Sequence, residues 1–365
     1  KDIILMSIQE ALKTNYSFYP AIVEDYVSDK IILTIIIDCF YNLELVRQAI
    51  DSVLVQSYQN VELMLIDNGS NNDVKKYLLE IYGRKNTALI KFRENQFSWK
   101  DTSKGVAVCW NAGLIHSRGD IVAHLAYDDM ISPDYACRMS KLFMENDSCV
   151  TAAPLPVSID INGNVNKKLS DGYKEKNKRD KYSSGKEIAL NILQSNTKRI
   201  FSAPGEILVI KKELLIKYGG FDRLNDLTQV IKFAIHGESG FDPKAKLFWR
   251  HHSGQVNKQG SARYLIWCSE FSETIKDIGI VDMWTRIFSQ KDVNILKKFI
   301  KIYHRSLATN AISAQLRKKN INGLGAVFVK ILLECPLNLL YSIFYLNFEI
   351  VRMISEKVNF TKKNT

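Results

Sequence analysis

The sequence predicts an α/β protein with a mostly parallel sheet flanked by helices, followed by an all-helical C-terminal region. Three observations support this fold class. The run KIILTIII (30–37), rich in β-branched residues, is typical of a parallel strand buried on both faces. Strand-like and helix-like segments alternate as far as residue 129, which indicates βαβ units. After residue 263, apolar residues recur at helical spacing.

The individual elements are expected at regular spacing along the first half of the chain. Residues 1–29 should form an N-terminal helical extension and a loop ahead of the strand at 30–37. Beyond it we expect helices at 43–56, 73–82 and near 104–117, and strands at 61–67, 88–92 and within 120–129. Ligands of parallel sheets bind at the carboxyl ends of the strands, so Asp38, Asp67 and Asp128 should meet at one edge.

The later part of the chain is less regular. We expect residues 30–262 to form one domain, with a helix near 185–196, and residues 263–365 to form a helical, basic amphipathic region. The charge-free stretch 335–348 is shorter than the roughly 18 residues that span a bilayer. The C-terminal helices are therefore expected to contact a membrane surface; packing against the core or a second copy is the alternative.

The positive charge is concentrated in two segments. The net charge is +11, yet ten Lys and three Arg face only four acidic residues in 291–365, and eight basic residues face three acidic ones in 164–186. The rest of the chain is slightly acidic, which argues against nucleic acid as a partner and for local contacts with phosphate or an anionic surface. The segment 164–186 is expected to be a solvated loop, with closure over a ligand as the alternative.

The six cysteines form no CxxC pair and lie mostly in apolar runs. They are expected to be reduced core residues of a cytoplasmic protein, and we recognise no secretory signal at the N-terminus. Peripheral attachment to the inner face of the cytoplasmic membrane is compatible with this location. The sequence leaves open whether the protein forms an oligomer.

Two adjacent carboxylates, Asp128 and Asp129, follow the strand within 120–129. Clustered acids repel one another unless a cation lies between them, and Mg²⁺ or Mn²⁺ bridging a diphosphate would supply it. A turn or a helix cap is the alternative explanation of the pair.

Several segments in a fixed order resemble one enzyme family. They are IIIDCFYN, SVLVQSYQNVELMLIDNGSNND, NAGLIHSRGDIVAHLAYDDMISPDY, KYGGFD and HHSGQ. Together they resemble the family 2 glycosyltransferases over roughly residues 31–257. The resemblance implies a GT-A (Rossmann-like) fold and an inverting, metal-dependent transfer of a sugar from a nucleotide-sugar donor.

The resemblance also implies a set of donor-binding residues. Asp67 would accept a hydrogen bond from the base, commonly uracil, in a pocket framed by the residues after the first strand. The helix GVAVCWNAGL carries an Asn-x-Gly that would lie under the donor. The residues expected to contact the donor are Asp38, Phe40, Tyr41, Asp67, Asn111, Gly113 and Asp128.

The metal site departs from the family pattern. The Asp-x-Asp motif of the family has Ala126 at its first position here, so Asp128 is the expected metal ligand and Asp129 its neighbour. The segment WRHHSGQ resembles the family's His-Pro-Gly-Gln and makes His252 the second expected ligand, with His251 as the alternative. Imidazole beside carboxylate suits Mn²⁺ better than Mg²⁺.

The catalytic base is expected after GGFD. In the family a Glu-Asp pair there begins a helix; here Asn225 and Asp226 take those places, which makes Asp226 the expected base. Asp222 is the alternative base, and a helix N-cap is the alternative role of Asp226.

The expected function is therefore transfer of a hexosyl or N-acetylhexosaminyl group, with UDP as the expected nucleotide, to a glycan or lipid-linked oligosaccharide in surface polysaccharide biosynthesis. Two alternatives stay open. One is a GT-A scaffold or binding protein without catalysis, which Ala126 and Asn225 favour. The other is a sugar nucleotidyltransferase, which should carry a Gly-rich loop after the first strand, whereas DCFYNLELVRQ has no glycine.

Overall fold

The computed structural model describes residues 6–22, 26–97, 102–194, 208–221, 232–252 and 321–334, together with positions 285, 288–291, 293, 294, 312 and 316. The chain divides into two compact units, residues 1–252 and 253–365. In the second unit the helix α13 (Ile321–Glu334) is described. The domain boundary expected at 262/263 lies outside the described residues and stays a prediction. No helix among the described residues is long and apolar enough to span a bilayer.

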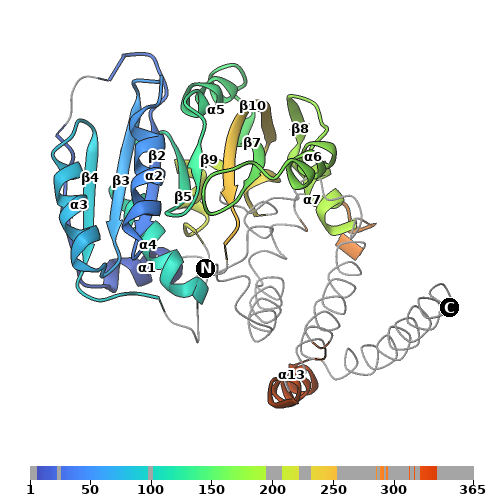
Figure 1. The fold of residues 1–365 in the computed structure, drawn as a ribbon. Helices are drawn as coiled ribbons and strands as arrows, with labels where there is room; N and C mark the ends of the chain where they lie inside the picture. The colour runs from blue at the N-terminus through green and yellow to red at the C-terminus, as the bar shows by residue number, and fades with distance from the viewer. Residues whose placement is uncertain are drawn as a thin grey trace, which may run out of the picture. The chain divides into compact units, whose positions relative to one another are not determined.

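The first unit is built on one mixed sheet (Figure 1). Its centre is four parallel strands, β4 (Thr87–Phe92), β3 (Val61–Asp67), β2 (Leu33–Cys39) and β5 (Ile121–Ala126), in that order. The strand β9 (Val209–Lys211) runs antiparallel between β5 and β7 (Cys149–Ile159). The long strand β10 (Glu238–Arg250) pairs parallel with β7 and carries two short antiparallel strands, β6 (Met130–Ile131) and β8 (Tyr182–Ser184).

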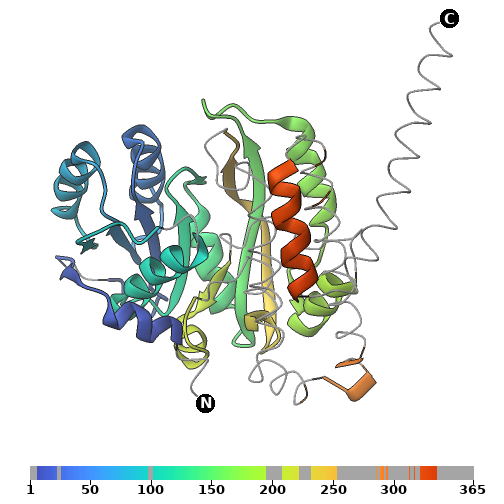
Figure 2. The same cartoon turned by 90° about the horizontal axis from the view of Figure 1, so that it is seen from below.

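Helices cover both faces of the central strands. The helices α2 (Leu43–Leu54) and α3 (Asn72–Tyr82) lie on one face, and α1 (Met6–Lys13) and α4 (Thr102–His116) lie on the other (Figures 1 and 2). The remaining described helices of this unit are α5 (Tyr135–Met144), α6 (Lys167–Lys176), α7 (Gly185–Gln194) and α8 (Lys212–Lys217). The expected α/β class, with helices on both faces of a largely parallel sheet, is confirmed.

The core explains why the central strands were recognisable. Residues 33–37 of β2 are all buried, because helices cover both faces of the strand. Gly113 lets α4 approach this strand closely: a Cβ atom there would lie 2.9 Å from Cγ2 of Ile36. The helix-to-sheet packing beside the site therefore depends on a residue without a side chain.

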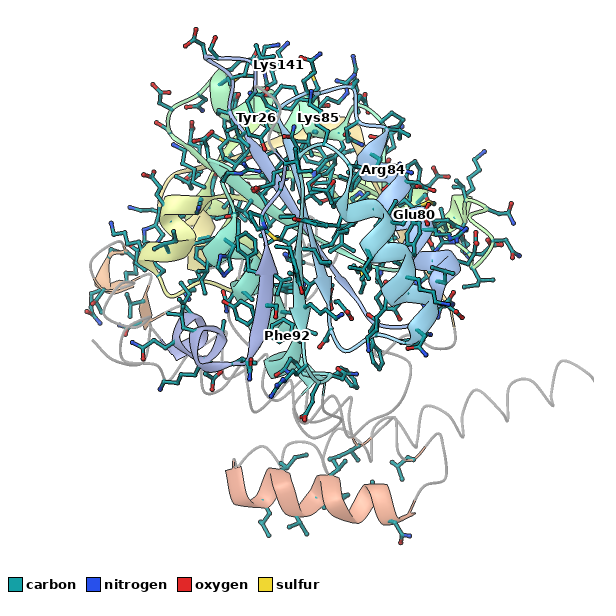
Figure 3. All side chains as sticks on the ribbon, turned by 90° about the vertical axis from the view of Figure 1, so that its left-hand side faces the viewer. Tyr26, Glu80, Arg84, Lys85, Phe92 and Lys141 are labelled. Atoms are coloured by element: carbon teal, nitrogen blue, oxygen red, sulfur yellow. The ribbon has the colours of Figure 1, made fainter. Side chains whose placement is uncertain are left out.

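The structure differs from expectation in two places. Residues 16–19 form the edge strand β1 rather than a loop, antiparallel to β4. Tyr16 packs on Phe92, the residue labelled on β4 in Figure 3, with ring centroids 5.2 Å apart. The prediction that 164–186 is a loop was wrong, because the segment contains α6 and β8. The side chain of Asn166 caps α6 by accepting from Leu169 N, and Tyr173 packs on Trp249 of β10.

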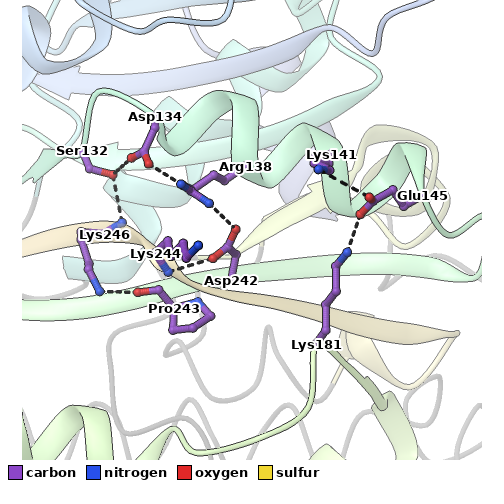
Figure 4. Close-up of polar contacts among 10 residues, drawn as sticks. All are labelled: Ser132, Asp134, Arg138, Lys141, Glu145, Lys181, Asp242, Pro243, Lys244 and Lys246. Carbon is purple, nitrogen blue, oxygen red and sulfur yellow. Dashed lines mark hydrogen bonds and ion pairs between the residues drawn. The ribbon is translucent and has the colours of Figure 1, made fainter.

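The second half of β10 is anchored to α5. Arg138 forms ion pairs with Asp134 and, at 3.1 Å, with Asp242, where the pairing of β10 with β7 is irregular (Figure 4). Ser132 Oγ donates to Asp134 at 2.7 Å and accepts from Lys246 N at 3.1 Å. These contacts fix the register in which β10 continues towards its last residue, Arg250.

The buried histidine of β5 gives the fold a predictable acid sensitivity. The His124 ring stacks on Trp110 with centroids 3.7 Å apart, and neither ring nitrogen has a hydrogen-bond partner among the described residues. Burial lowers the pKa of His124 from 6.5 to about 3. Below pH 6.5 the unfolded chain therefore binds a proton that the folded protein does not bind, and stability falls as the pH falls towards 3.

We expect His124→Leu to unfold at lower temperature than the wild type at pH 7, because the leucine does not reproduce the flat ring. The difference should shrink by roughly 1.4 kcal/mol for each pH unit below 6.5, since the variant has no proton to bind there. Thermal unfolding between pH 7 and 4.5 measures this. Parallel melting curves for the two proteins across that range would contradict it.

Candidate active site

The expected site residues emerge at one edge of the central strands. In the parallel register Asp38 lies opposite Ala126 and Cys39 lies opposite Asp67. Asp128 follows two residues after the end of β5. Parallel pairing therefore brings the three carboxylates to neighbouring strand ends, as the sequence pattern predicted.

Asp128 and His252 lie in direct contact. Nε2 of His252 is 2.9 Å from Oδ2 of Asp128, although 124 residues separate them, and both side chains are almost buried. His252 stands two residues beyond the end of β10. The anchoring of β10 thus brings the second expected ligand to the first.

A buried arginine holds this pair of segments together, and the sequence analysis missed it. Arg250 is fully buried, and its Nε donates to the main-chain oxygen of Asp128 at 2.7 Å. In return, the main-chain N–H of Arg250 donates to Oδ1 of the buried Asp129 at 2.8 Å. Each strand end therefore binds the backbone of the other through a side chain.

The guanidinium of Arg250 reaches two further segments. Nη1 donates to the carbonyl of Ile161 at 2.8 Å and to that of Asp160 at 3.3 Å, and Nη2 donates to Oε1 of Gln48 on α2 at 2.7 Å. We call Arg250 with these contacts and those to Asp128 and Asp129 the Arg250 brace. Its sequence signal was an Arg two positions before the expected His ligand, in WRHHSGQ.

Asp38 lies partly exposed beside the aromatic core. Trp110 Nε1 donates to its Oδ1 at 3.3 Å. Burial raises the pKa of Asp38 from 3.8 to about 7; the nearby charge of Asp128 adds to the rise, and the hydrogen bond from Trp110 opposes it. Asp38 is thus poised to change charge near neutral pH.

We expect Asp38→Asn to stabilise the protein at pH 8. The unfolded chain releases the Asp38 proton near pH 4 and the folded protein releases it near pH 7, so stability falls as the pH rises through that window. The asparagine avoids this loss, worth roughly 1–3 kcal/mol above pH 7 for a partly exposed group. Melting temperatures at pH 5 and pH 8 measure it, with the exposed Asp147→Asn as control. An Asp38→Asn advantage that does not grow with pH would contradict the expectation.

Aromatic side chains surround Asp38 and Asp128. The ring of Tyr41 lies 5.4 Å from those of Phe40 and Tyr127. Tyr127 was missed from the sequence; burial, its hydrogen bond to Tyr41 and the charge of Asp128 raise its pKa, so the phenol stays protonated. Tyr41 is 41% exposed, so this aromatic residue is accessible to a ligand.

Asp67 ends β3 in a fixed turn. Its Oδ1 accepts from Ser70 N at 2.8 Å, and Ser70 Oγ donates to the carbonyl of Cys39 at 3.0 Å. Gly69 has φ +62°, and a Cβ atom there would lie 2.5 Å from Asn95 N, so only glycine fits against that segment. The carboxylate is therefore held in one orientation at the strand end.

Asn111 has a structural partner that was not expected. Its Nδ2 donates to the carbonyl of Phe221 at 2.8 Å, and its Oδ1 accepts from Phe221 N at 2.7 Å. The amide thus pairs with the main chain of GGFD, and Gly113, two residues later, serves the packing on β2. Contacts of these two residues with a donor stay predictions.

The remaining expected residues divide between described and undescribed parts. Asp222, Asn225 and Asp226 lie in 222–231, outside the described residues, so the expected base stays a prediction. His251 is described: its ring lies 4.3 Å from that of Trp249, whereas His252 is the histidine that contacts Asp128. The geometry therefore favours His252 over His251 as the partner of Asp128.

The pair Asp128 and His252 has the spacing of two metal ligands. Neighbouring ligands of an octahedral ion with bonds of about 2.1 Å lie roughly 3 Å apart. Oδ2 of Asp128 and Nε2 of His252 are 2.9 Å apart. No group of three or more His, Cys, Asp or Glu within the described residues could hold a metal. The donor set of this pair, one carboxylate oxygen and one imidazole nitrogen, suits a divalent ion that takes its other ligands from a bound molecule.

Comparison with known proteins finds matches within the first unit. The model of the family described as "Glycosyl transferase family 2" matches residues 34–198. An uncharacterized glycosyltransferase of Haemophilus influenzae is 34% identical over 112 residues, which cover 30% of this chain and 42% of that protein. Glycosyltransferase GlyA of Streptococcus pneumoniae is 29% identical over 120 residues, 33% of this chain and 16% of GlyA. The chain thus matches less than half the length of these relatives.

Two solved structures resemble the fold. The mannosyltransferase PcManGT of Pyrobaculum calidifontis, in complex with GDP-Man and Mn²⁺, superposes with a TM-score of 0.49 at 15% identity, over 93% of this chain and 92% of PcManGT. S. aureus TarS 1–349, in complex with UDP-GlcNAc, gives a TM-score of 0.46 at 14% identity, over 82% of this chain and 91% of TarS.

Proposed function

Since the glycosyltransferase family 2 model matches residues 34–198, we propose that this protein transfers a sugar from a nucleotide-sugar donor, with UDP as the nucleotide, to a hydroxyl group of a glycan or lipid-linked acceptor. The observation that carries the proposal is the contact of Asp128 with His252 at the strand ends that also present Asp38 and Asp67. A surface polysaccharide is the proposed destination of the sugar.

Asp128 and His252 would hold the metal ion. A divalent ion, with Mn²⁺ favoured by the imidazole ligand, neutralises the diphosphate that leaves when the sugar is transferred. Two protein ligands leave room for phosphate oxygens. The chemistry expected of this pair is therefore binding and orientation of the donor's diphosphate.

The base of the nucleotide would bind beside Asp67. A fixed carboxylate accepts a charge-assisted hydrogen bond from the ring N–H of uracil. The exposed ring of Tyr41 can cover one face of the base, and Phe40 supports Tyr41 from the side. Asp38 closes the pocket between the base and the metal ligands.

The acceptor hydroxyl must lose a proton as the new bond forms. We assign this proton to Asp226, which follows the segment whose main chain Asn111 holds. In a single displacement the acceptor oxygen bonds to the anomeric carbon, the bond to the diphosphate breaks, and the carboxylate keeps the proton.

Calorimetry and mass spectrometry test the donor. Purified protein should bind UDP more tightly with Mn²⁺ than with EDTA, and a panel of UDP-sugars and GDP-mannose should identify one donor that is consumed when a glycan acceptor is present. A scaffold without catalysis would consume no donor. Release of pyrophosphate from a nucleoside triphosphate and a sugar phosphate would instead identify a nucleotidyltransferase.

The proposed acceptor also gives the C-terminal region a role. Residues 291–365 carry a net charge of +9 and apolar residues at helical spacing, which suits an anionic membrane surface where lipid-linked acceptors lie. We expect the full chain to co-sediment with vesicles containing anionic lipid at low salt, and a chain ending at Gly260 to remain in the supernatant. Equal sedimentation of the two proteins would remove the membrane role of this region.

A further inference from the structure

The Arg250 brace connects four segments that meet at the candidate metal ligands. One side chain binds the carbonyls of Asp128 and Ile161 and the amide oxygen of Gln48, while the main chain of Arg250 binds Asp129. None of these acceptors, save the Asp129 carboxylate, carries a charge. The guanidinium therefore acts as a fork of hydrogen-bond donors, and lysine cannot copy that geometry.

A fully buried guanidinium destabilises a fold unless hydrogen bonds compensate for the lost contact with water. Arg250 has no exposed surface, so its cation has been removed from water, which costs free energy. A hydrophobic side chain of similar volume could fill the same space. Apolar packing could not replace the hydrogen bond that Arg250 donates to the main chain of Asp128. This bond holds the backbone of Asp128, while the carboxylate of Asp128 contacts His252.

The brace also joins both members of the ligand pair through one residue. Arg250 lies two positions before His252 and binds the main-chain oxygen of Asp128. Any movement of Arg250 therefore shifts the imidazole and the carboxylate relative to each other. At a separation of 2.9 Å, a small shift changes the fit of the pair to an ion.

We propose that Arg250 is the positioning residue of the Asp128–His252 pair and that its hydrogen bonds set the affinity of this pair for a divalent cation bound with a nucleotide diphosphate. The proposal rests on the proposed function for its ligand. It assigns Arg250 no contact with donor or acceptor: it acts through Asp128 and His252 alone.

Three variants and one matched control test the proposal. Arg250→Lys keeps the charge and loses the fork, Arg250→Met loses both, and Gln48→Met removes one acceptor from the partly exposed α2 surface. Arg118→Met is the control, because it removes an ion pair of 2.9 Å with the buried Glu62 at the opposite end of the strands.

Calorimetry with UDP and Mn²⁺ gives the first readout. We expect the Mn²⁺-dependent gain in UDP affinity to fall roughly 10- to 100-fold in Arg250→Lys and at least as far in Arg250→Met. Gln48→Met should lose a few-fold and Arg118→Met should match the wild type. In transfer assays Arg250→Lys should lower kcat and leave KM for the acceptor unchanged, and excess Mn²⁺ should partly restore its rate.

Hydrogen exchange of the ligand-free proteins gives the second readout. Peptides covering 126–131 and 159–163 should exchange faster in Arg250→Lys than in the wild type, and those peptides should be unaffected in Arg118→Met. Unchanged exchange together with unchanged Mn²⁺ dependence in Arg250→Lys overturns the proposal. If Arg250→Met fails to fold, the results for Arg250→Lys and Gln48→Met decide whether the proposal holds.

The two readouts separate this proposal from the proposed function. A wild-type protein that binds no UDP with Mn²⁺ would refute the proposed function, and the exchange data would still show whether Arg250 holds Asp128. Normal UDP binding by the wild type, with no change in Arg250→Lys, would refute the positioning role alone.

Discussion

Asp128→Ala is expected to lower the transfer rate roughly a thousandfold. The alanine removes the carboxylate whose Oδ2 lies 2.9 Å from Nε2 of His252, and with it several kcal/mol of the charge stabilisation proposed for the departing diphosphate. UDP binding should no longer respond to Mn²⁺. Initial rates with the donor found in the screen, measured with Mn²⁺ and with EDTA, give the result.

The fold should survive this substitution. Arg250 binds the main-chain oxygen of Asp128, which alanine retains, so the brace keeps its contact. The exposed Asp147→Ala is the matched control and should transfer at the wild-type rate. His252→Ala should weaken Mn²⁺ dependence in the same direction as Asp128→Ala. Transfer that resists both EDTA and Asp128→Ala would show that no metal at this site takes part.

Asp226→Asn is expected to lower the transfer rate by about 10²- to 10⁴-fold, the range found for removal of a general base. The amide keeps the shape of the side chain and cannot take the proton of the acceptor hydroxyl. Affinity for UDP with Mn²⁺ should stay within about twofold of the wild type, since the proposed function puts the donor's diphosphate at Asp128 and His252. Single-turnover rates and calorimetry on the same preparation measure the two effects.

Asp222→Asn separates the two acids of this segment. If Asp226 is the base, Asp222→Asn should keep most of its activity. Loss of activity in Asp222→Asn with an active Asp226→Asn would move the assignment to Asp222. A loss of UDP affinity equal to the loss of rate in Asp226→Asn would indicate a binding role in place of proton transfer.

The central strands were predictable because one physical signal determines them. A parallel strand covered on both faces is mostly apolar, and the runs 35–37 and 63–66 show this directly. The strand ends then place Asp38, Asp67 and Asp128 at one edge. The contact of His252 with Asp128 required the resemblance to the family, because no local pattern relates residues 124 positions apart.

The edge strand and the basic segment were missed for a different reason. Tyr16 to Tyr19 is too short to show a pattern, and its stability comes from pairing with β4 and from rings contributed by Phe92 and His116. In 164–186 the many lysines hide a helix that packs through Tyr173. Both elements depend on tertiary contacts, which composition does not report.

The polar contacts around the site were the least predictable part. In the segment that contains Arg250, only the histidines were interpreted as functional residues. Full burial of an arginine also contradicts the usual preference of that residue for the surface. Asn111 was interpreted as a donor contact, and the structure shows that both ends of its amide bind Phe221. A hydrogen-bonding side chain indicates that a partner exists, and the fold decides which one.

The pairing of Asn111 with Phe221 also bears on how this protein could diversify. Because the amide of Asn111 hydrogen-bonds only to main-chain atoms of Phe221, these hydrogen bonds do not involve the side chains of 222–231. That stretch can therefore be exchanged between homologues, or randomised in a library, while its point of attachment is retained. Under the proposed function, selectivity for the incoming alcohol would then be inherited separately from the chemistry of the leaving group.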